Sequence, residues 1–353
     1  MTIKWKSILV TIFLALLSAT TLFLLYQNNK LKSQADQDRK VIELQKTWID
    51  SIRTMDQLAM MSLILKNVDE ELAQHPQRIL SDNIIARIAA LSYSLKPHVV
   101  DLRDTMQAHL LSPERGQLLL MLSRMKMDTG SFQKILLQTT FADADLEKAN
   151  FQSVDLRWAN LAGANLRDAN LQSANLYETD LKSAMLWGAN LQKANLQGTY
   201  LTRADMRWSN MNEADLRRAD LFGADLSSAQ LHKANFLNAI LQWSVLDDAY
   251  LTEADLSGVF MFRTSLKRTQ LQQAILRETN LSWADLTEAN LSDADITGCT
   301  LSNAELNNLV IKEKHWIESL FQFGVHGAEA IRTKYQIIDE SSDTAFQYRL
   351  QKK

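Results

Sequence analysis

Cysteine is almost absent: Cys299 is the only one among 353 residues, so no disulfide can form within the chain. A single cysteine leaves the redox compartment undecided. Proline is also rare, and the three prolines all lie before residue 141, so none interrupts the chain beyond that point. The net charge of −3 is small, which removes any whole-chain electrostatic argument for binding nucleic acid.

Residue patterns that support catalysis or metal binding are missing as well. The six histidines are scattered, and no two have the spacing of metal ligands. There is neither a glycine-rich phosphate-binding loop nor a Gly-x-Ser-x-Gly nucleophile motif. Half of the carboxylates in residues 141–308 recur at one position of a repeat, where a role in turns explains them. We therefore expect no enzyme activity, no metal and no cofactor.

What the chain does contain is a five-residue repeat that runs unbroken through residues 141–306. Every fifth residue is apolar at all 34 positions, and 27 of these are leucine. The residue two places earlier is small, with 23 alanines, and the residue between them is Asn or Asp in 21 units. On an α-helix such leucines would drift around the cylinder, and on a flat strand they would alternate between faces. The pattern is satisfied if each unit forms one side of a coil.

Units such as Ala164-Asn165-Leu166 and Ala284-Asp285-Leu286 resemble the signature of the pentapeptide repeat family, which is close to Ala-(Asp/Asn)-Leu-X-X. The resemblance implies a mainly β fold, a right-handed quadrilateral β-helix with four units per coil. On that basis the 34 units form about 8.5 coils, in a rod on the order of 40 Å long. Cys299 then takes a small inward position in place of alanine.

The chain divides into four predicted regions. They are a transmembrane anchor at 1–30, an α-helical region at 31–138, the pentapeptide repeat solenoid at 139–308, and a capping helix with a tail at 309–353.

The anchor is predicted because residues 8–26 are almost wholly apolar and long enough to cross a bilayer as a helix. Trp5 and Tyr26 lie where aromatic residues meet the membrane interface. A cleaved signal peptide is the alternative, although the apolar run is longer than usual and no clear cleavage site follows. We expect a single-pass protein of a bacterial inner membrane with its body outside the cytoplasm. A cytoplasmic body stays the alternative, because the flanking lysines are nearly balanced.

Between residues 32 and 138 the apolar spacing becomes helical, with a stripe that includes Val41, Met55 and Leu63 along a first long helix. The helices are expected to pack as a small bundle. The other predicted features are a break at His75-Pro76, a helix capped by Ser81 and ended by Pro97, a third helix over 98–111, a fourth from Ser112 through Met125, and a short piece over 132–137.

Two further segments concern the ends of the solenoid. Residues 111–119, with the sequence LSPERGQLL, are similar to a stretch found in some membrane-anchored pentapeptide repeat proteins. After Leu306 the register fails, and residues 311–323 are predicted to form an amphipathic helix that stops at Gly324. A solenoid exposes its core at both ends, so we expect this helix and the helix before Phe141 to act as caps.

The outward positions predict an interaction face. With four units per coil, units four apart stack on one side, and that side holds six of the eleven outward aromatic residues. Exposed apolar patches of this kind usually mark interfaces. The alternative is that the tail or a helix of the bundle covers the patch. The predicted face consists of Tyr200, Phe222, Ile240, Trp243, Phe260, Phe262 and Trp283.

The sequence therefore predicts a membrane-tethered scaffold that presents this face to a protein partner or to a second copy of the chain, as a homodimer. The alternative is a role that some pentapeptide repeat proteins play, in which an acidic rod mimics DNA on a type II topoisomerase. Residues 141–308 carry 22 acidic and 14 basic residues, a net charge of −8. A mimic needs a strong field of one sign, whereas these charges are mixed. Nucleic acid itself is not expected as a partner.

Overall fold

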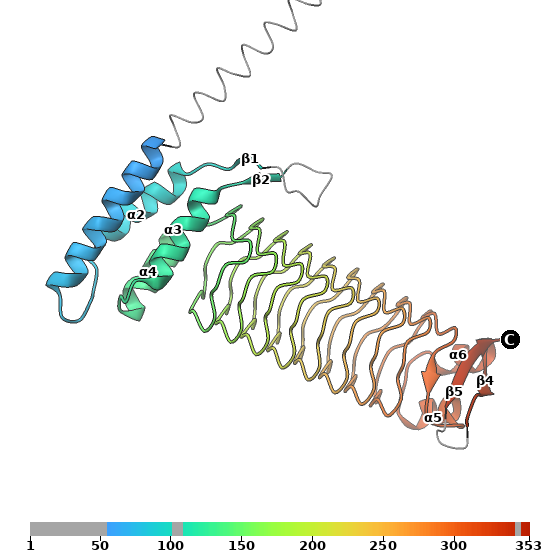
Figure 1. Ribbon diagram of the computed structural model, residues 1–353. Helices are drawn as coiled ribbons and strands as arrows, with labels where there is room; N and C mark the ends of the chain where they lie inside the picture. Colours follow the sequence, from blue (N-terminus) through green and yellow to red (C-terminus); the bar gives the residue numbers. More distant parts are fainter. Residues whose placement is uncertain (1–54, 101–108, 343–346) are drawn as a thin grey trace, which may run out of the picture. The chain divides into compact units, whose positions relative to one another are not determined.

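The computed structural model describes residues 55–100, 109–342 and 347–353, and the chain separates into compact units at 1–60 and 61–353 (Figure 1). The predicted anchor at 1–30 lies outside the described residues. Within the described ranges, no helix combines the length and apolar character needed to cross a bilayer.

Helices precede the solenoid. Residues 55–74 are helical, followed by α2 (Asp82–Ser94), α3 (Pro113–Arg124) and α4 (Thr129–Gln138). The predicted caps of α2 and α3 are confirmed. The Ser81 side chain accepts a hydrogen bond from the Ile84 amide, and the Ser112 side chain accepts one from the Arg115 amide, with proline in the first turn of α3.

The predicted third helix over 98–111 is wrong at both of its described ends. His98–Val100 (β1) and His109–Leu111 (β2) are strands that pair antiparallel, so His98 lies opposite Leu111. The β-branched pair Val99-Val100 favours a strand. This local preference outweighs the weak helical spacing.

The expectation that one apolar stripe of the first helix packs in the core is also wrong for the described part of that helix, which begins at residue 55. Met55 and Leu63 are exposed. The helix carries apolar residues on more than one side. Their spacing alone did not show which side is buried in the core that also contains residues of α2. The buried residues of this helix are Met61, Ile64, Leu65, Val68 and Leu72.

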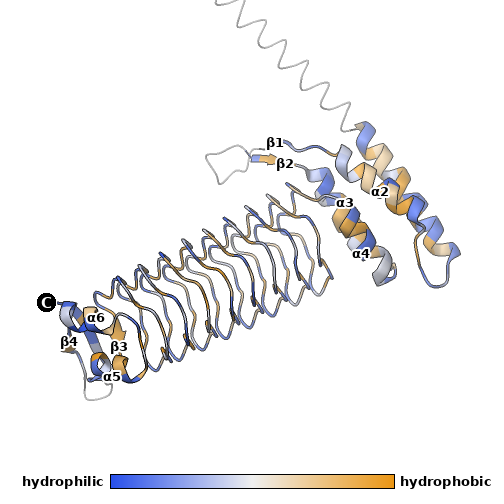
Figure 2. Ribbon diagram, turned by 180° about the vertical axis from the view of Figure 1, so that it is seen from behind, coloured by the Kyte–Doolittle hydropathy of each residue, from blue (hydrophilic) through white to orange (hydrophobic). Residues whose placement is uncertain are grey.

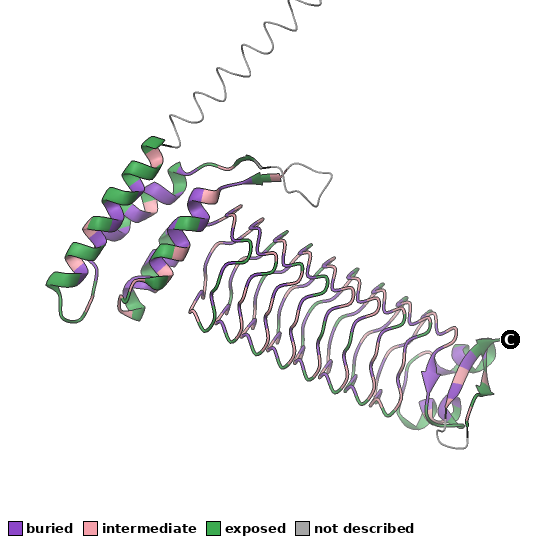
Figure 3. Ribbon diagram, viewed as in Figure 1, coloured by how far each residue is buried: buried purple, intermediate pink, exposed green. Residues whose placement is uncertain are grey.

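The repeats coil as a quadrilateral solenoid in which residues twenty apart pair in parallel, as in Asp145, Asn165 and Met185. The Leu166 amide donates to the Met185 carbonyl at 2.7 Å, and this bond type recurs from coil to coil. All 34 fifth-position side chains are buried, with none more than 3% exposed (Figure 3). Apolar and polar residues therefore alternate regularly around each coil (Figure 2). The inward assignment is confirmed.

Threonine side chains at the small inward position donate to carbonyls of the neighbouring coil. The Thr199 hydroxyl donates to the Leu176 carbonyl at 2.8 Å, and the Thr279 hydroxyl donates to the Leu256 carbonyl at 2.7 Å. Cys299 makes the equivalent contact to Leu276, and burial raises the pKa of its thiol to about 12. This cysteine is a core residue with no accessible reactivity.

The second residue after each inward leucine adopts a left-handed backbone conformation. Its φ lies between +51° (Glu178) and +62° (Trp158) wherever it is not glycine. A β-branched side chain is strained at positive φ, and no Val, Ile or Thr occurs at this position in any of the 34 units. The absence of β-branched residues is therefore a sequence signal of the left-handed corner position, which the analysis of the repeat above did not include.

The N-terminal cap uses the LSPERG stretch. The Ser112 amide donates to the Asp143 carbonyl at 2.7 Å, and the Asp145 amide donates back to Ser112 at 3.1 Å, so the start of α3 extends the first coil. Arg115 is buried and donates to the Ala142 carbonyl at 2.6 Å. A Cβ at Gly116 would collide with the backbone oxygen of Asp145. This stretch joins the helical region to the solenoid.

The C-terminal cap is a small sheet with two helices. It contains β3 (Val310–Ile311), α5 (Trp316–Gln322), α6 (Ala328–Lys334), β4 (Tyr335–Asp339) and β5 (Tyr348–Lys352), with strand order β3-β5-β4. The helix predicted over 311–323 is therefore shorter, because Ile311 belongs to β3. The tail, which the sequence did not place, closes the rod.

Candidate docking face

The structure brings the seven residues of the predicted interaction face onto one side of the solenoid, called the aromatic face from here on. Consecutive parallel bridges join Tyr200 to Asp220, Asp220 to Ile240, and Ile240 to Phe260. The corner positions, among them Trp243 and Trp283, form a second column on the same side. The Trp243 amide donates to the carbonyl of Phe262, which lies beside this column, at 3.1 Å.

The aromatic face is open to solvent. Trp243 and Trp283 are 50% and 54% exposed, and Tyr200 and Phe260 are exposed by similar fractions. Phe222 and Ile240 are less exposed, and Phe262 is half-buried. The described part of the tail forms the C-terminal cap instead of covering this side. Large rings held in this exposed state gain free energy when a second surface covers them.

Arg263 belongs to this face and was missed by the sequence reading. Its guanidinium carbon lies 4.8 Å from the ring centre of Trp243, 5.7 Å from that of Trp283 and 5.4 Å from that of Phe262. The register already placed Arg263 between the two tryptophans, one coil from each. An arginine in register with two tryptophans is therefore the sequence signal of this contact.

Ion pairs are frequent on the other sides of the solenoid, and on the aromatic face one joins Lys182 to Asp180 at 3.4 Å. Arg207 pairs with Asp205 at 2.7 Å, and Arg268 pairs with Asp248 at 2.7 Å. The hydrogen bond from Arg268 lowers the pKa of the Asp248 carboxyl. Among the described residues, neither Arg203 nor Arg263 of the aromatic face takes part in an ion pair within 4.0 Å.

The opposite side of the coil is rich in amides and is called the amide face. It comprises the units whose inward residues are 151, 171 and every twentieth residue to 291. Asn170 donates to Asn150 at 3.2 Å across one coil step, and Lys193 pairs with Glu213 at 3.5 Å. Its polar groups thus bind one another along the rod. Tyr250 is the single outward aromatic residue of this face.

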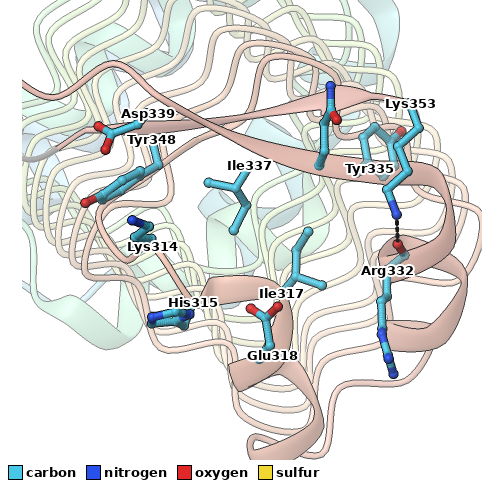
Figure 4. A pocket seen from close by; sticks show the side chains of 11 residues that line it. Lys314, His315, Ile317, Glu318, Arg332, Tyr335, Ile337, Asp339, Tyr348 and Lys353 are labelled. Carbon is cyan, nitrogen blue, oxygen red and sulfur yellow. Dashed lines mark hydrogen bonds between the residues drawn. The ribbon is translucent and has the colours of Figure 1, made fainter.

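A cavity of about 450 Å³ lies in the C-terminal cap (Figure 4). Ile317 and Ile337 line its centre, with Glu318, Lys314 and other charged groups around them. Acidic and basic side chains both line the cavity, so it favours no ligand of one charge. Elsewhere in the described ranges, no three His, Cys, Asp or Glu side chains come together as metal ligands would.

Comparison with known proteins concerns the repeat region. The family model for pentapeptide repeats matches in eight copies between residues 135 and 303. A search of curated proteins gives no match.

Solved structures give similar results. HetL, a pentapeptide repeat protein involved in heterocyst differentiation regulation from the cyanobacterium Nostoc sp. strain PCC 7120, is 34% identical, with 49% of this chain and 83% of HetL covered and a TM-score of 0.36. Rfr23 from the cyanobacterium Cyanothece 51142 is 24% identical, over 31% of this chain and 86% of Rfr23, with a TM-score of 0.29. QnrB1, a plasmid-mediated fluoroquinolone resistance protein, is 12% identical, over 46% of this chain and 94% of QnrB1, with a TM-score of 0.21.

Proposed function

The chain belongs to the pentapeptide repeat family through residues 135–303, and we propose that it is a non-enzymatic scaffold whose aromatic face docks a protein partner. The observation that carries the proposal is the exposure of this face, on which Trp243, Phe260 and Trp283 are each about half open to solvent. Long solenoids commonly present an extended side for binding. Aromatic residues and arginine are also the side chains that dominate the binding energy of protein interfaces.

The energetics support a docking role. Fully burying one large apolar side chain is worth about 1.5–3 kcal/mol. A partner that covers several rings of this face therefore gains enough to offset much of the cost of association. Backbone entropy adds little to that cost, because the rings stand on a hydrogen-bonded solenoid that is already ordered.

We also propose that residues 8–26 tether the scaffold to a membrane. The support is the apolar run of the sequence alone. Removing residues 1–30 is expected to release the protein into the soluble fraction. A shortened protein that still sediments with membranes after a high-salt wash would contradict a single anchor.

DNA mimicry has less support. Many acids of the solenoid are neutralised by nearby arginines, as in Asp205 with Arg207 and Asp215 with Arg217. Such pairing weakens the field of one sign on which a mimic depends.

The docking proposal is tested by changing Trp243 and Phe262 together to Ser. Serine is native at the corner position of Trp243 in other units, for example at Ser153, and at the position of Phe262, directly after the inward residue, for example at Ser227, so the backbone should tolerate both changes. We expect the melting temperature to stay within a few degrees while self-association, or capture of a co-purifying protein, is lost. Both are measured by size-exclusion chromatography with light scattering and by affinity purification.

Trp208→Ser is the matched control. Trp208 has the same residue type and the same left-handed corner position, and it is 63% exposed on a different side. It should change neither stability nor association. If the double variant unfolds, the stripe is internal packing. If its association is unchanged, the face has no docking role.

A further inference from the structure

We propose that Arg263 is the recognition residue of the aromatic face and that it receives a carboxylate from an apolar, acidic segment of a partner polypeptide. This inference rests on the docking role proposed above and names the chemistry of the partner. It follows from the position of the guanidinium, from the absence of an internal acid beside it, and from the apolar character of the surrounding surface.

The guanidinium is held between aromatic rings. Its carbon lies over the rings of Trp243 and Trp283, which stand one coil before and one coil after it, and over the ring of Phe262. These contacts restrict a long side chain before any partner arrives, which reduces the entropy lost on binding. Among the described residues the Arg263 guanidinium makes no side-chain hydrogen bond, so its N–H groups remain available to a partner.

Arg263 differs from the arginine of the next unit in the residue that lies one coil before it. Arg268 occupies the same corner position five residues later, and the residue one coil before it is Asp248, which accepts two hydrogen bonds from it at 2.7 Å. The residue one coil before Arg263 is Trp243. An aromatic ring thus replaces the carboxylate, and Arg263 joins no ion pair among the described residues. Its charge is therefore available to a partner.

The apolar surface around Arg263 favours a partner segment that also carries apolar side chains. Ile240 and Phe260 form the neighbouring column and are exposed. A carboxylate accepts two parallel N–H bonds from arginine, and adjacent apolar side chains of the same segment can cover the rings. Nucleic acid or an anionic lipid surface would instead require a cluster of cations. The ring faces that contact Arg263 are also occupied, so they do not serve as stacking platforms for bases.

The test uses immobilised ten-residue peptides in which Leu, Phe and Trp flank a central Glu, each repeated with Gln and with Lys in its place. We expect wild-type protein to bind the best Glu peptides at least about tenfold more tightly than their Gln versions, the size of a charge-assisted hydrogen bond. Arg263→Gln should abolish this preference, and Arg263→Glu should shift it to the Lys peptides. Gln273 adopts the same corner conformation, so glutamine fits the backbone.

Arg203→Gln is the matched control, because Arg203 occupies the same column without stacked tryptophans. It should keep most of the preference for Glu. The inference is overturned if Glu and Gln peptides bind equally, if no peptide binds, if both arginine variants lose the preference alike, or if inorganic phosphate competes better than acetate. The proposed function fails separately, if the Trp243 and Phe262 double variant still associates as the wild type does.

Discussion

The aromatic face and the amide face stand on opposite sides of the same coils and share one backbone geometry. On the amide face, outward groups bind each other along the rod, as Asn170 binds Asn150 and Lys193 binds Glu213. On the aromatic face, rings and Arg263 remain open to solvent. The difference shows that the coil tolerates varied outward chemistry as long as the inward residues and the corner conformation are kept. Function can therefore differ from side to side of one rod.

The largest expected effect comes from breaking the framework that both faces share. Leu171 is fully buried, so Leu171→Asp places an unpaired charge in the core or forces it to stay protonated. We expect the free energy of unfolding to fall by several kcal/mol. Chemical denaturation measures it.

The control for that variant lies in the same unit. Ser173→Asp changes an exposed corner residue, and aspartate is already native at this position in Asp168 and Asp248. It should be nearly silent. Similar stability losses in the two variants would show that the inward and outward assignments are wrong.

The next effect concerns the cap that supports the first coil beneath both faces. Gly116→Ala places a methyl group against the backbone oxygen of Asp145, which cannot move without disturbing the Ser112 bridge. Overpacking of this kind costs about 1–3 kcal/mol. Thermal melting should show this loss, whereas Gln117→Ala, on the exposed side of α3, should leave stability unchanged. A silent Gly116→Ala would mean that the cap does not pack tightly on the coil.

The smallest effect separates the two kinds of arginine. The pKa of Asp248 is lowered in the folded protein by the Arg268 hydrogen bond, so the pair stabilises the fold at neutral pH and is lost as pH falls through that pKa. Asp248→Asn should be less stable than wild type by at most about 1 kcal/mol at pH 7 and equal to it near pH 2. Urea unfolding at a series of pH values measures the difference.

The variant Arg263→Gln tests the other arginine, which has no ion pair like that of Arg268 with Asp248. Because Arg263 has no carboxylate partner in the described chain, this variant should show the same dependence of stability on pH as the wild type. A change in acid sensitivity would reveal an internal partner and would remove the basis for assigning Arg263 to an external one.

The solenoid was predictable because its period of five, kept over 34 units, is satisfied by one kind of coil. Short-range spacing was less reliable in the helical region. It predicted a helix where His98–Val100 and His109–Leu111 pair as strands, and the β-branched pair Val99-Val100 favours this outcome. The tail was not predictable, because β5 depends on pairing with β3 far earlier in the chain, as where Arg349 pairs with Val310, thirty-nine residues before it. Long-range pairing of that kind leaves no local pattern in a sequence.

For the docking face, the repeat register alone predicted that the seven side chains share one side of the solenoid, but it did not predict which side chains touch. Arg263 shared that register with Trp243 and Trp283, yet only the geometry shows its guanidinium over both rings. The exposure of these rings depends on where the tail folds. The sequence alone left open whether the tail covers them.

The most direct test of the docking role compares crosslinking from the two opposite sides. A photoreactive phenylalanine is placed singly at Phe222 and Trp243 on the aromatic face, and at Gln172 and Gln192 on the amide face. All four positions lie on the surface of the solenoid. After irradiation of living cells, crosslinks to a second polypeptide, whether a partner or another copy, should form from the aromatic face alone. Equal crosslinking from both faces, or crosslinking confined to Gln172 and Gln192, would contradict the account.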